Sequence, residues 1–509
     1  MRDKSNSYYM VLNLVTGLIT VVVQFAISFF LSPFIVKALG AEANGYTQLA
    51  SNFVMYASLL TTAFNSMASR FVSVAYHQGQ IEKAKQYYSS VYVVNMCLIA
   101  ILLPLSIIVT LSLEHVIVIA NVDFADVKLL FGCVFANFLL SMISSLYSVS
   151  MYVKNAVFYS NILNCLKTVC NAILLFVAFS LLPIKIFYVS FVTLLLGVLF
   201  LPANVHYQHK LLPNIGFESK SFSLVAVREM LLSGIWNSVN QCGHLLLTGL
   251  DLLLSNWFIS PYAMGLIAIS KTIPSAIFQL AATLNSNFSP SITQSWAKGD
   301  YDNVMKELRV AIKISIIIVS VPIVTFCCLG EKFYSLWQPT LNPIVLMILS
   351  ALGCLPFIVF AGTQVLYNVY TASNRLKVNS LTFIALGVVN VVIVYIGLKC
   401  LPQYGMYIIV GVSSILAIIR QLIIMLPYTA WLLEQRWYTF YEDLGLTLLC
   451  CCLNVAISYG VIKMLPIHNW LSLIVDGGLI ALGAIAMETI FLLNKNERNK
   501  LSQVIKRNK

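Results

Sequence analysis

Three ionisable side chains stand inside long apolar stretches of this chain: Lys167, Asp251 and Lys271. An isolated cation at mid-bilayer depth costs at least ~2.5 to 3.5 kcal/mol, so each lysine needs a partner that offsets this cost. Two partners suit them, an anionic substrate group or an internal ion pair such as Lys271 with Asp251. The lysines are therefore candidate anion-binding groups, and Asp251 is the candidate carrier of a coupling proton or sodium ion. Arg70 and Arg420 lie nearer the ends of their stretches, where snorkelling to the membrane interface is the favoured interpretation.

Polar residues recur every three or four positions in the stretch 224–257, which places them on one face of a helix. They are Ser233, Asn237, Gln241, His244, Thr248, Asp251 and Ser255. Weaker rows follow the stretches that contain Gln24, Asn65 and Gln279, and Asn164 shares a helix face with Lys167. A single row of this kind is explained by helix-to-helix packing, since small and polar residues mediate it in bilayers. Four rows favour a hydrated central cavity. The candidate substrate-binding residues are Lys167, Lys271, Asn164, Asn237, Gln241, His244, Gln24, Asn65 and Gln279.

The elements that position these residues are transmembrane helices. Of the 509 residues, 59% are hydrophobic and 10% are charged, with a mean hydropathy of +0.86, which excludes an ordinary soluble enzyme and a disordered chain. Breaking the apolar runs at polar clusters predicts fourteen spans. Their approximate bounds are 9–37, 46–76, 88–112, 127–151, 156–182, 184–205, 224–257, 262–296, 308–330, 342–370, 376–398, 403–430, 441–463 and 469–493.

The distribution of basic residues predicts the orientation. With a cytoplasmic amino terminus, the segments on the inner side hold 21 of the 31 Lys and Arg residues, which is the positive-inside pattern. Both termini are then cytoplasmic. The net charge of +12 reflects this topology and attraction to anionic inner-leaflet lipid rather than nucleic-acid binding, because no basic run is interleaved with aromatic residues.

The second half of the chain resembles the first at a constant offset. This offset aligns Gly45 with Gly265, Asn65-Ser66 with Asn285-Ser286, and Gly79 with Gly299. Because the offset contains six spans, the two copies have the same orientation. The predicted fold is an all-α polytopic membrane protein of about fourteen transmembrane helices, with two parallel six-helix repeats and two C-terminal helices. Its parts are an N-terminal lobe (1–208), a cytoplasmic linker (209–222), a C-terminal lobe (223–430), and two further helices with a basic cytoplasmic tail (431–509).

Motifs for covalent chemistry are absent. The sequence contains no GxxxxGK[ST] for ATP, no HExxH and no GxSxG, and its twelve cysteines form no CxxC pair. No predicted outer loop is large enough to build an aqueous catalytic pocket with paired carboxylates. We therefore expect neither an enzyme nor a metal site or organic cofactor; the only expected co-substrate is a coupling H⁺ or Na⁺. A channel is disfavoured, because a two-fold repeat with polar rows at mid-membrane suits alternating access.

Two segments resemble a known family. The run from Phe29 to Gly40 followed by Gly45-Tyr46, and the run from Gly249 to Ser255 with Gly265, are similar to the first outer turn and the seventh span of bacterial polysaccharide flippases. These belong to the multidrug/oligosaccharidyl-lipid/polysaccharide exporter superfamily. The resemblance covers residues 9–430 and implies a two-lobed alternating-access transporter that moves undecaprenyl-pyrophosphate-linked oligosaccharides. The superfamily's peptidoglycan lipid flippases also have fourteen spans but a cavity richer in arginine.

The expected function is therefore export of lipid-linked oligosaccharide units from the inner to the outer leaflet of a bacterial cytoplasmic membrane, for surface polysaccharide, lipopolysaccharide or capsule biosynthesis. Lys167 and Lys271 are expected to bind the pyrophosphate or acidic sugars. Expected partners are the lipid-linked oligosaccharide, membrane lipids, a glycan polymerase and glycosyltransferases. The alternatives are an ion-coupled exporter of drugs or metabolites and, in a different class, a membrane glycosyltransferase.

Overall fold

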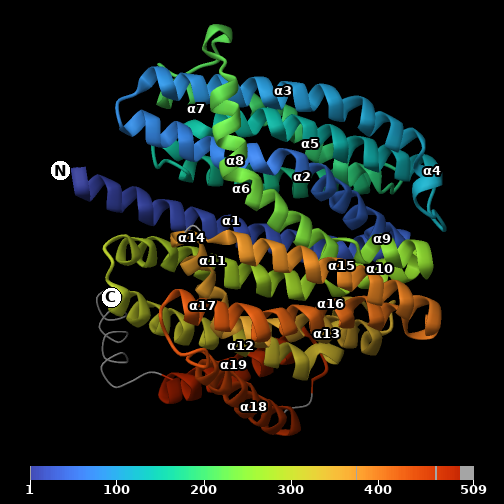
Figure 1. Ribbon diagram of the computed structural model, residues 1–509. Helices are drawn as coiled ribbons and strands as arrows, with labels where there is room; N and C mark the ends of the chain where they lie inside the picture. The colour runs from blue at the N-terminus through green and yellow to red at the C-terminus, as the bar shows by residue number, and fades with distance from the viewer. Residues whose placement is uncertain (1, 374, 465–466, 493–509) are drawn as a thin grey trace. The chain divides into compact units, whose positions relative to one another are not determined.

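The computed structural model describes residues 2–373, 375–464 and 467–492, which form helices and short connections with no strand among them (Figure 1). The first half contains α1 (Arg2–Leu39), α2 (Ala41–His77), α3 (Ile81–Leu111), α4 (Leu113–Val116), α5 (Phe124–Val153), α6 (Phe158–Leu181), α7 (Phe187–Leu211), α8 (Leu224–His244) and α9 (Asp251–Phe258). The second half contains α10 (Pro261–Ser270), α11 (Thr272–Ala297), α12 (Tyr301–Trp337), α13 (Pro343–Thr363), α14 (Tyr367–Ala372), α15 (Leu376–Cys400), α16 (Gly405–Ile419), α17 (Leu426–Leu432), α18 (Tyr441–Met464) and α19 (Trp470–Leu492).

Each of the fourteen predicted spans is occupied by one of these helices or by two consecutive ones, which confirms the all-α polytopic fold. Among the described residues, twelve spans are long and apolar enough to cross a membrane by length and composition. The two that fall short are α2 and the pair α8 and α9. These are the spans with the most complete polar rows, so their low hydropathy comes from the residues that were expected to face away from lipid.

Polar side chains fix several helix starts. Asn342 accepts hydrogen bonds from the first backbone amides of α13, directly before Pro343, and Asp123, Ser223 and Asp300 cap α5, α8 and α12 in the same way. Such caps satisfy amides that have no partner inside the helix, and proline is well tolerated at the first helical position. The connections can therefore stay short without leaving backbone groups unbonded.

The internal repeat is visible in the helix bounds. Helix α2 covers residues 41–77, and α10 with α11 covers 261–297, so both ends keep the offset that aligns Gly45 with Gly265. The turns that follow contain Gly79 (φ 76°) and Gly299 (φ 71°), in the left-handed region that favours glycine. The next helices begin at Ile81 and Tyr301, again at the same offset. The predicted repeat is therefore confirmed at the level of helix order and turn conformation.

The chain divides into two compact units. The N-terminal unit comprises residues 1–245 and 249–266, and the C-terminal unit comprises 246–248 and 267–509. Each has a core around its copy of the glycine turn, and the two cores use equivalent positions: Val72, Ala84, Tyr88 and Val91 in the first; Ile292, Val304, Leu308 and Ala311 in the second. The two units are defined by contacts between residues rather than by the sequence repeat, so α8 belongs to the N-terminal unit. The lobe boundaries at 208 and 223 stay a prediction.

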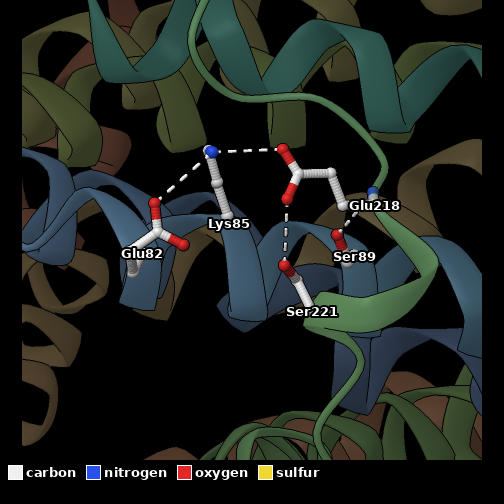
Figure 2. Close-up of polar contacts among 5 residues, drawn as sticks. All are labelled: Glu82, Lys85, Ser89, Glu218 and Ser221. Atoms are coloured by element: carbon white, nitrogen blue, oxygen red, sulfur yellow. Dashed lines mark hydrogen bonds and ion pairs between the residues drawn. The ribbon is translucent and has the colours of Figure 1, made fainter.

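The cytoplasmic linker predicted at 209–222 is an ordered strap on the N-terminal unit. Figure 2 shows Glu218 of the strap beside Lys85 of α3, with 3.1 Å between the carboxylate and Nζ, and Lys85 also reaches Glu82 at 3.4 Å. The Glu218 amide donates to Ser89 Oγ at 3.1 Å, and Ser221 Oγ donates to the Glu218 carboxylate at 3.2 Å. The Lys85 ammonium lowers the pKa of the Glu218 carboxyl below its usual range.

The two predicted C-terminal helices are α18 and α19, and both pack against α12 and against each other. The predicted basic tail at 493–509 lies outside the described residues. Helices α18 and α19 follow the second repeat and have no counterpart in the first.

Candidate functional site

The transmembrane segment that carries Asp251 is interrupted just before that residue. Helix α8 ends at His244, a π-helical segment covers Leu245–Gly249, and α9 starts at Asp251. A π-helical turn displaces the regular hydrogen-bond ladder and is found frequently at functional sites. In a bilayer, carbonyls released in this way need other donors, because no lipid group can supply them.

In the C-terminal unit, two side chains hold the carbonyls of residues 246–248. Asn390 of α15 donates from Nδ2 to the carbonyl oxygens of Leu246 (3.2 Å) and Leu247 (3.0 Å). Lys271, between α10 and α11, donates from Nζ to the carbonyl oxygen of Thr248 at 2.9 Å. Lys271 thus provides a hydrogen bond to the backbone at the helix break.

In the N-terminal unit, the carbonyl oxygen of Gly249 accepts hydrogen bonds from two side chains of α2. These are Asn52 Nδ2 at 3.1 Å and Tyr56 Oη at 2.8 Å. Asp251 follows two residues later in the first turn of α9, where the helix dipole favours an acidic side chain, and only 2% of its surface is exposed. Asp251 is therefore buried at the start of the helix that follows the break.

The polar row of α8 meets the row of α2 within the N-terminal unit. Asn237 Nδ2 donates to Ser66 Oγ at 3.1 Å, and Ser238 Oγ donates to the carbonyl oxygen of Leu59 at 3.1 Å. Close to these contacts the backbones approach so tightly that a Cβ atom at Gly234 would lie 1.8 Å from the carbonyl oxygen of Ala63. This stretch of the row acts as helix-to-helix packing, one of the two interpretations that the sequence left open.

The remaining polar candidates differ in where their side chains lie. Asn65 accepts from Asn95 of α3 at 3.0 Å, so its side-chain oxygen is engaged within the N-terminal unit. Gln241 is half-buried, and the rest are exposed on their helices: Gln24 on α1, Asn164 on α6, His244 on α8 and Gln279 on α11. Exposed amides on membrane-depth helix faces suit water or a polar ligand, because hydrocarbon offers them no hydrogen bond.

Lys167 is a half-buried cation on α6 with α7 beside it. A Cβ atom at Gly197 of α7 would lie 3.6 Å from Lys167 Nζ and 3.0 Å from the Asn137 side-chain oxygen, so the missing side chain leaves room for both groups. Within residues 2–373, 375–464 and 467–492, Lys167 has no hydrogen bond or ion pair. Its neighbour one turn further along, Asn171, is engaged with Thr193 Oγ1 at 2.9 Å. The ammonium of Lys167 is thus available to a ligand.

The interpretation of Arg420 as a snorkelling residue is wrong. Only 5% of its surface is exposed. Arg420 is the first residue of a second π-helical segment, Arg420–Met425, in the C-terminal unit. Its guanidinium donates to the side-chain oxygen of Asn379 and stacks 3.9 Å from the ring centroid of Phe383. Arg70 is exposed, as expected for a side chain that snorkels to the membrane interface.

Sequence reasoning missed the donors that stabilise the first break, namely Asn52, Tyr56 and Asn390. Asn390 gave a usable signal, since it is a lone amide in the apolar run from Phe383 to Leu398. A buried amide in such a run needs a partner. The partner turned out to be backbone, which the residue pattern alone does not indicate.

The chain is similar to a curated protein over most of its length. It is 27% identical over 476 residues, 93% of both chains, to the Bacillus subtilis (strain 168) protein "Uncharacterized membrane protein EpsK". No protein-family model matches the chain.

Solved structures share its fold. One is a lipid II flippase, MurJ, in an inward closed conformation, with a TM-score of 0.67 and 14% identity over 95% of this chain and 100% of that one. Another is an inward-facing multidrug resistance MATE family transporter of the MOP superfamily, with a TM-score of 0.63 and 12% identity over 82% of this chain and 98% of that one. A third, the MATE multidrug transporter DinF-BH, has a TM-score of 0.60 and 13% identity over 85% of this chain and 97% of that one.

Proposed function

We propose that this chain, a multi-pass membrane protein with the fold of the multidrug/oligosaccharidyl-lipid/polysaccharide exporter superfamily, flips undecaprenyl-pyrophosphate-linked oligosaccharide units from the inner to the outer leaflet of a bacterial cytoplasmic membrane. Both termini are cytoplasmic, and movement follows alternating access. The flipped units supply surface polysaccharide synthesis, in which a glycan polymerase and glycosyltransferases act before and after this step.

The observation that carries the proposal is Lys167. A mid-span cation without a hydrogen bond or ion pair among the described residues is costly in a bilayer unless a ligand compensates it. A pyrophosphate or an acidic sugar supplies that compensation through charge-assisted hydrogen bonds. Exposed amides on α1, α6 and α11 add neutral donors and acceptors, which suit glycan hydroxyls.

The likeness to solved structures favours a lipid carrier over a soluble drug. The lipid II flippase structure covers 95% of this chain, whereas the two MATE structures cover 82% and 85%. A flippase therefore accounts for more of the chain, including the length that α18 and α19 add after the second repeat. Under this proposal Lys167 and Lys271 bind the anionic part of the substrate. The residues Gln24, Asn65, Asn164, Asn237, Gln241, His244 and Gln279 bind the glycan.

The test is the loss of flipping on neutralisation of Lys167. Lys167→Gln should lower surface glycan in the producing cell and slow leaflet transfer of a fluorescent lipid-linked oligosaccharide in proteoliposomes at least tenfold. The matched control is Lys185→Gln, which removes an exposed lysine in the connection between α6 and α7. Membrane levels of each variant are measured alongside. Wild-type transfer by both Lys167→Gln and the double variant with Lys271→Gln would contradict the proposal.

An ion-coupled drug or metabolite exporter is the second candidate, favoured by the buried Asp251 and by the MATE fold. In this case Asp251→Asn lowers resistance to cationic compounds, and the double lysine variant keeps normal glycan display. In the flippase, Asp251→Asn instead removes coupling to a proton or sodium gradient and leaves drug resistance unchanged.

A further inference from the structure

Helices α12, α18 and α19 bury two carboxyl groups that the proposed transport site does not use. Asp476 and Glu488 both lie on the buried side of α19, about 18 Å apart along its axis, and are 1% and 0% exposed. The three helices lie side by side in Figure 1. Buried acids at membrane depth are costly, and they mark functional positions when no cation compensates them.

Glu488 is the better defined of the two. One carboxyl oxygen accepts hydrogen bonds from Ser320 Oγ of α12 at 2.7 Å and from Asn454 Nδ2 of α18 at 2.6 Å. The other carboxyl oxygen of Glu488 and the side-chain oxygen of Asn454 are buried, with no hydrogen-bond partner among the described residues. Asn454 is itself only 1% exposed. Two buried oxygen acceptors therefore lack a donor among the described residues.

The titratable groups around Glu488 do not supply the missing donor. The elements packed on α19 are α12 and α18, and the titratable groups of α18 that face Glu488 are the thiols of Cys450 and Cys451. Arg309 and Lys313 of α12 act instead on the carboxylate of Asp443. Within the described ranges, Glu488 has no ion pair.

A bound proton removes the uncompensated charge of Glu488. A neutral carboxylic acid has one donor as well as acceptors, and it avoids the cost of an uncompensated buried charge. With the proton on the carboxyl oxygen that has no partner among the described residues, the other oxygen remains the carbonyl. It keeps both hydrogen bonds, from Ser320 Oγ at 2.7 Å and from Asn454 Nδ2 at 2.6 Å.

We propose that Glu488, with Asn454 and Ser320, is a proton-binding site that is occupied at neutral pH, separate from Asp251 and from the residues assigned to the substrate. Release of the proton leaves a charge that these helices can keep only by admitting water. Proton occupancy therefore sets how tightly α18 and α19 pack on α12. The site does not depend on which substrate the chain moves.

Infrared spectroscopy of the purified full-length protein in deuterated buffer tests whether Glu488 is protonated at neutral pH. At neutral pH the wild type should show the carbonyl band of a neutral carboxylic acid, and Glu488→Gln should lose that component. Glu442→Gln, an exposed acid on the same helix as Asn454, should leave the spectrum unchanged. Asp476→Asn should retain the component assigned to Glu488. Ser320→Ala should move it to higher frequency, because one hydrogen bond to the carbonyl is lost.

Two results would overturn the proposal. One is an unchanged neutral-acid band in Glu488→Gln together with no frequency shift in Ser320→Ala. The other is a rise in the unfolding temperature when NaCl replaces choline chloride at constant ionic strength, present in the wild type and absent in Glu488→Gln. The second result would assign the site to sodium. Ser320→Ala keeps the test decisive if Glu488→Gln fails to accumulate.

Discussion

Replacing Gly234 with alanine tests whether α8 packs on α2 as closely as the structure shows. A Cβ atom at this position would lie 1.8 Å from the carbonyl oxygen and 2.8 Å from the carbonyl carbon of Ala63. Cβ atoms essentially never approach other heavy atoms closer than 3.0 Å, so the two helices must separate to admit the methyl group. The obstacle is backbone, which cannot rotate away as a flexible side chain can.

The expected loss of stability in Gly234→Ala follows from the separation of α8 and α2. Overpacking a tight interface costs typically ~1–3 kcal/mol, and a backbone obstacle places Gly234→Ala at the upper end of this range. The separation also weakens the flanking hydrogen bonds from Asn237 to Ser66 and from Ser238 to the Leu59 carbonyl. Thermal unfolding of the purified protein in detergent, followed by tryptophan fluorescence, should show a clearly lower midpoint than the wild type.

Gly460→Ala is the matched control. Gly460 also lies inside a helix, α18, but a Cβ atom there meets nothing within 4 Å. Alanine in open space stabilises a helix by roughly 0.5–1 kcal/mol relative to glycine, so this variant should unfold at the wild-type temperature or above it. Equal midpoints for Gly234→Ala and Gly460→Ala would refute the close approach of α8 and α2.

Two further variants test the break and the strap. Asn390→Leu removes both side-chain hydrogen bonds to the carbonyls of residues 246 and 247, so it should destabilise the protein by ~1–3 kcal/mol. Backbone hydrogen exchange at 245–249 should become faster. Unchanged exchange there would contradict the role of Asn390 in stabilising the helix break. Glu218→Gln should speed trypsin cleavage at Lys220 at neutral pH, whereas Glu442→Gln should not. Because Lys85 lowers the pKa of Glu218, the wild-type strap should stay protected above the ordinary glutamate pKa of about 4.3 and lose its ion pair only as the pH falls through the lower folded-state pKa. Loss of protection between pH 7 and 5 would oppose this assignment.

Within the N-terminal unit, the starts of α2 and α10 are in close contact. Gly45 and Gly265 are equivalent in the two copies, and a Cβ atom at Gly45 would lie 3.0 Å from the Gly265 backbone. A Cβ atom at Gly265 would lie 2.3 Å from the carbonyl oxygen of Ala41.

The sequence predicted the rows of polar residues but not the residues to which they bond. Spacing placed Asn237 and Asn65 on polar helix faces, and the structure shows their partners: Asn237 bonds to Ser66 and Asn65 to Asn95. Periodicity shows which helix face a side chain occupies and carries no information on which neighbour that face meets. The comparable rows on α1 and α11 keep Gln24 and Gln279 exposed.

Sequence alone determined the class of protein, its fourteen spans and the offset of its repeat. These features are local, because hydropathy over about 20 residues decides whether a segment can cross a bilayer, and glycine marks a turn that needs positive φ. Tertiary structure alone decided where the helices break, that Arg420 is buried, and that Glu488 meets Ser320 and Asn454. A hydrogen bond between side chains 168 residues apart depends on how helices are arranged. Lipid offers a buried polar group no hydrogen bond, and the partner that such a group finds in the protein is set by the fold rather than by nearby sequence.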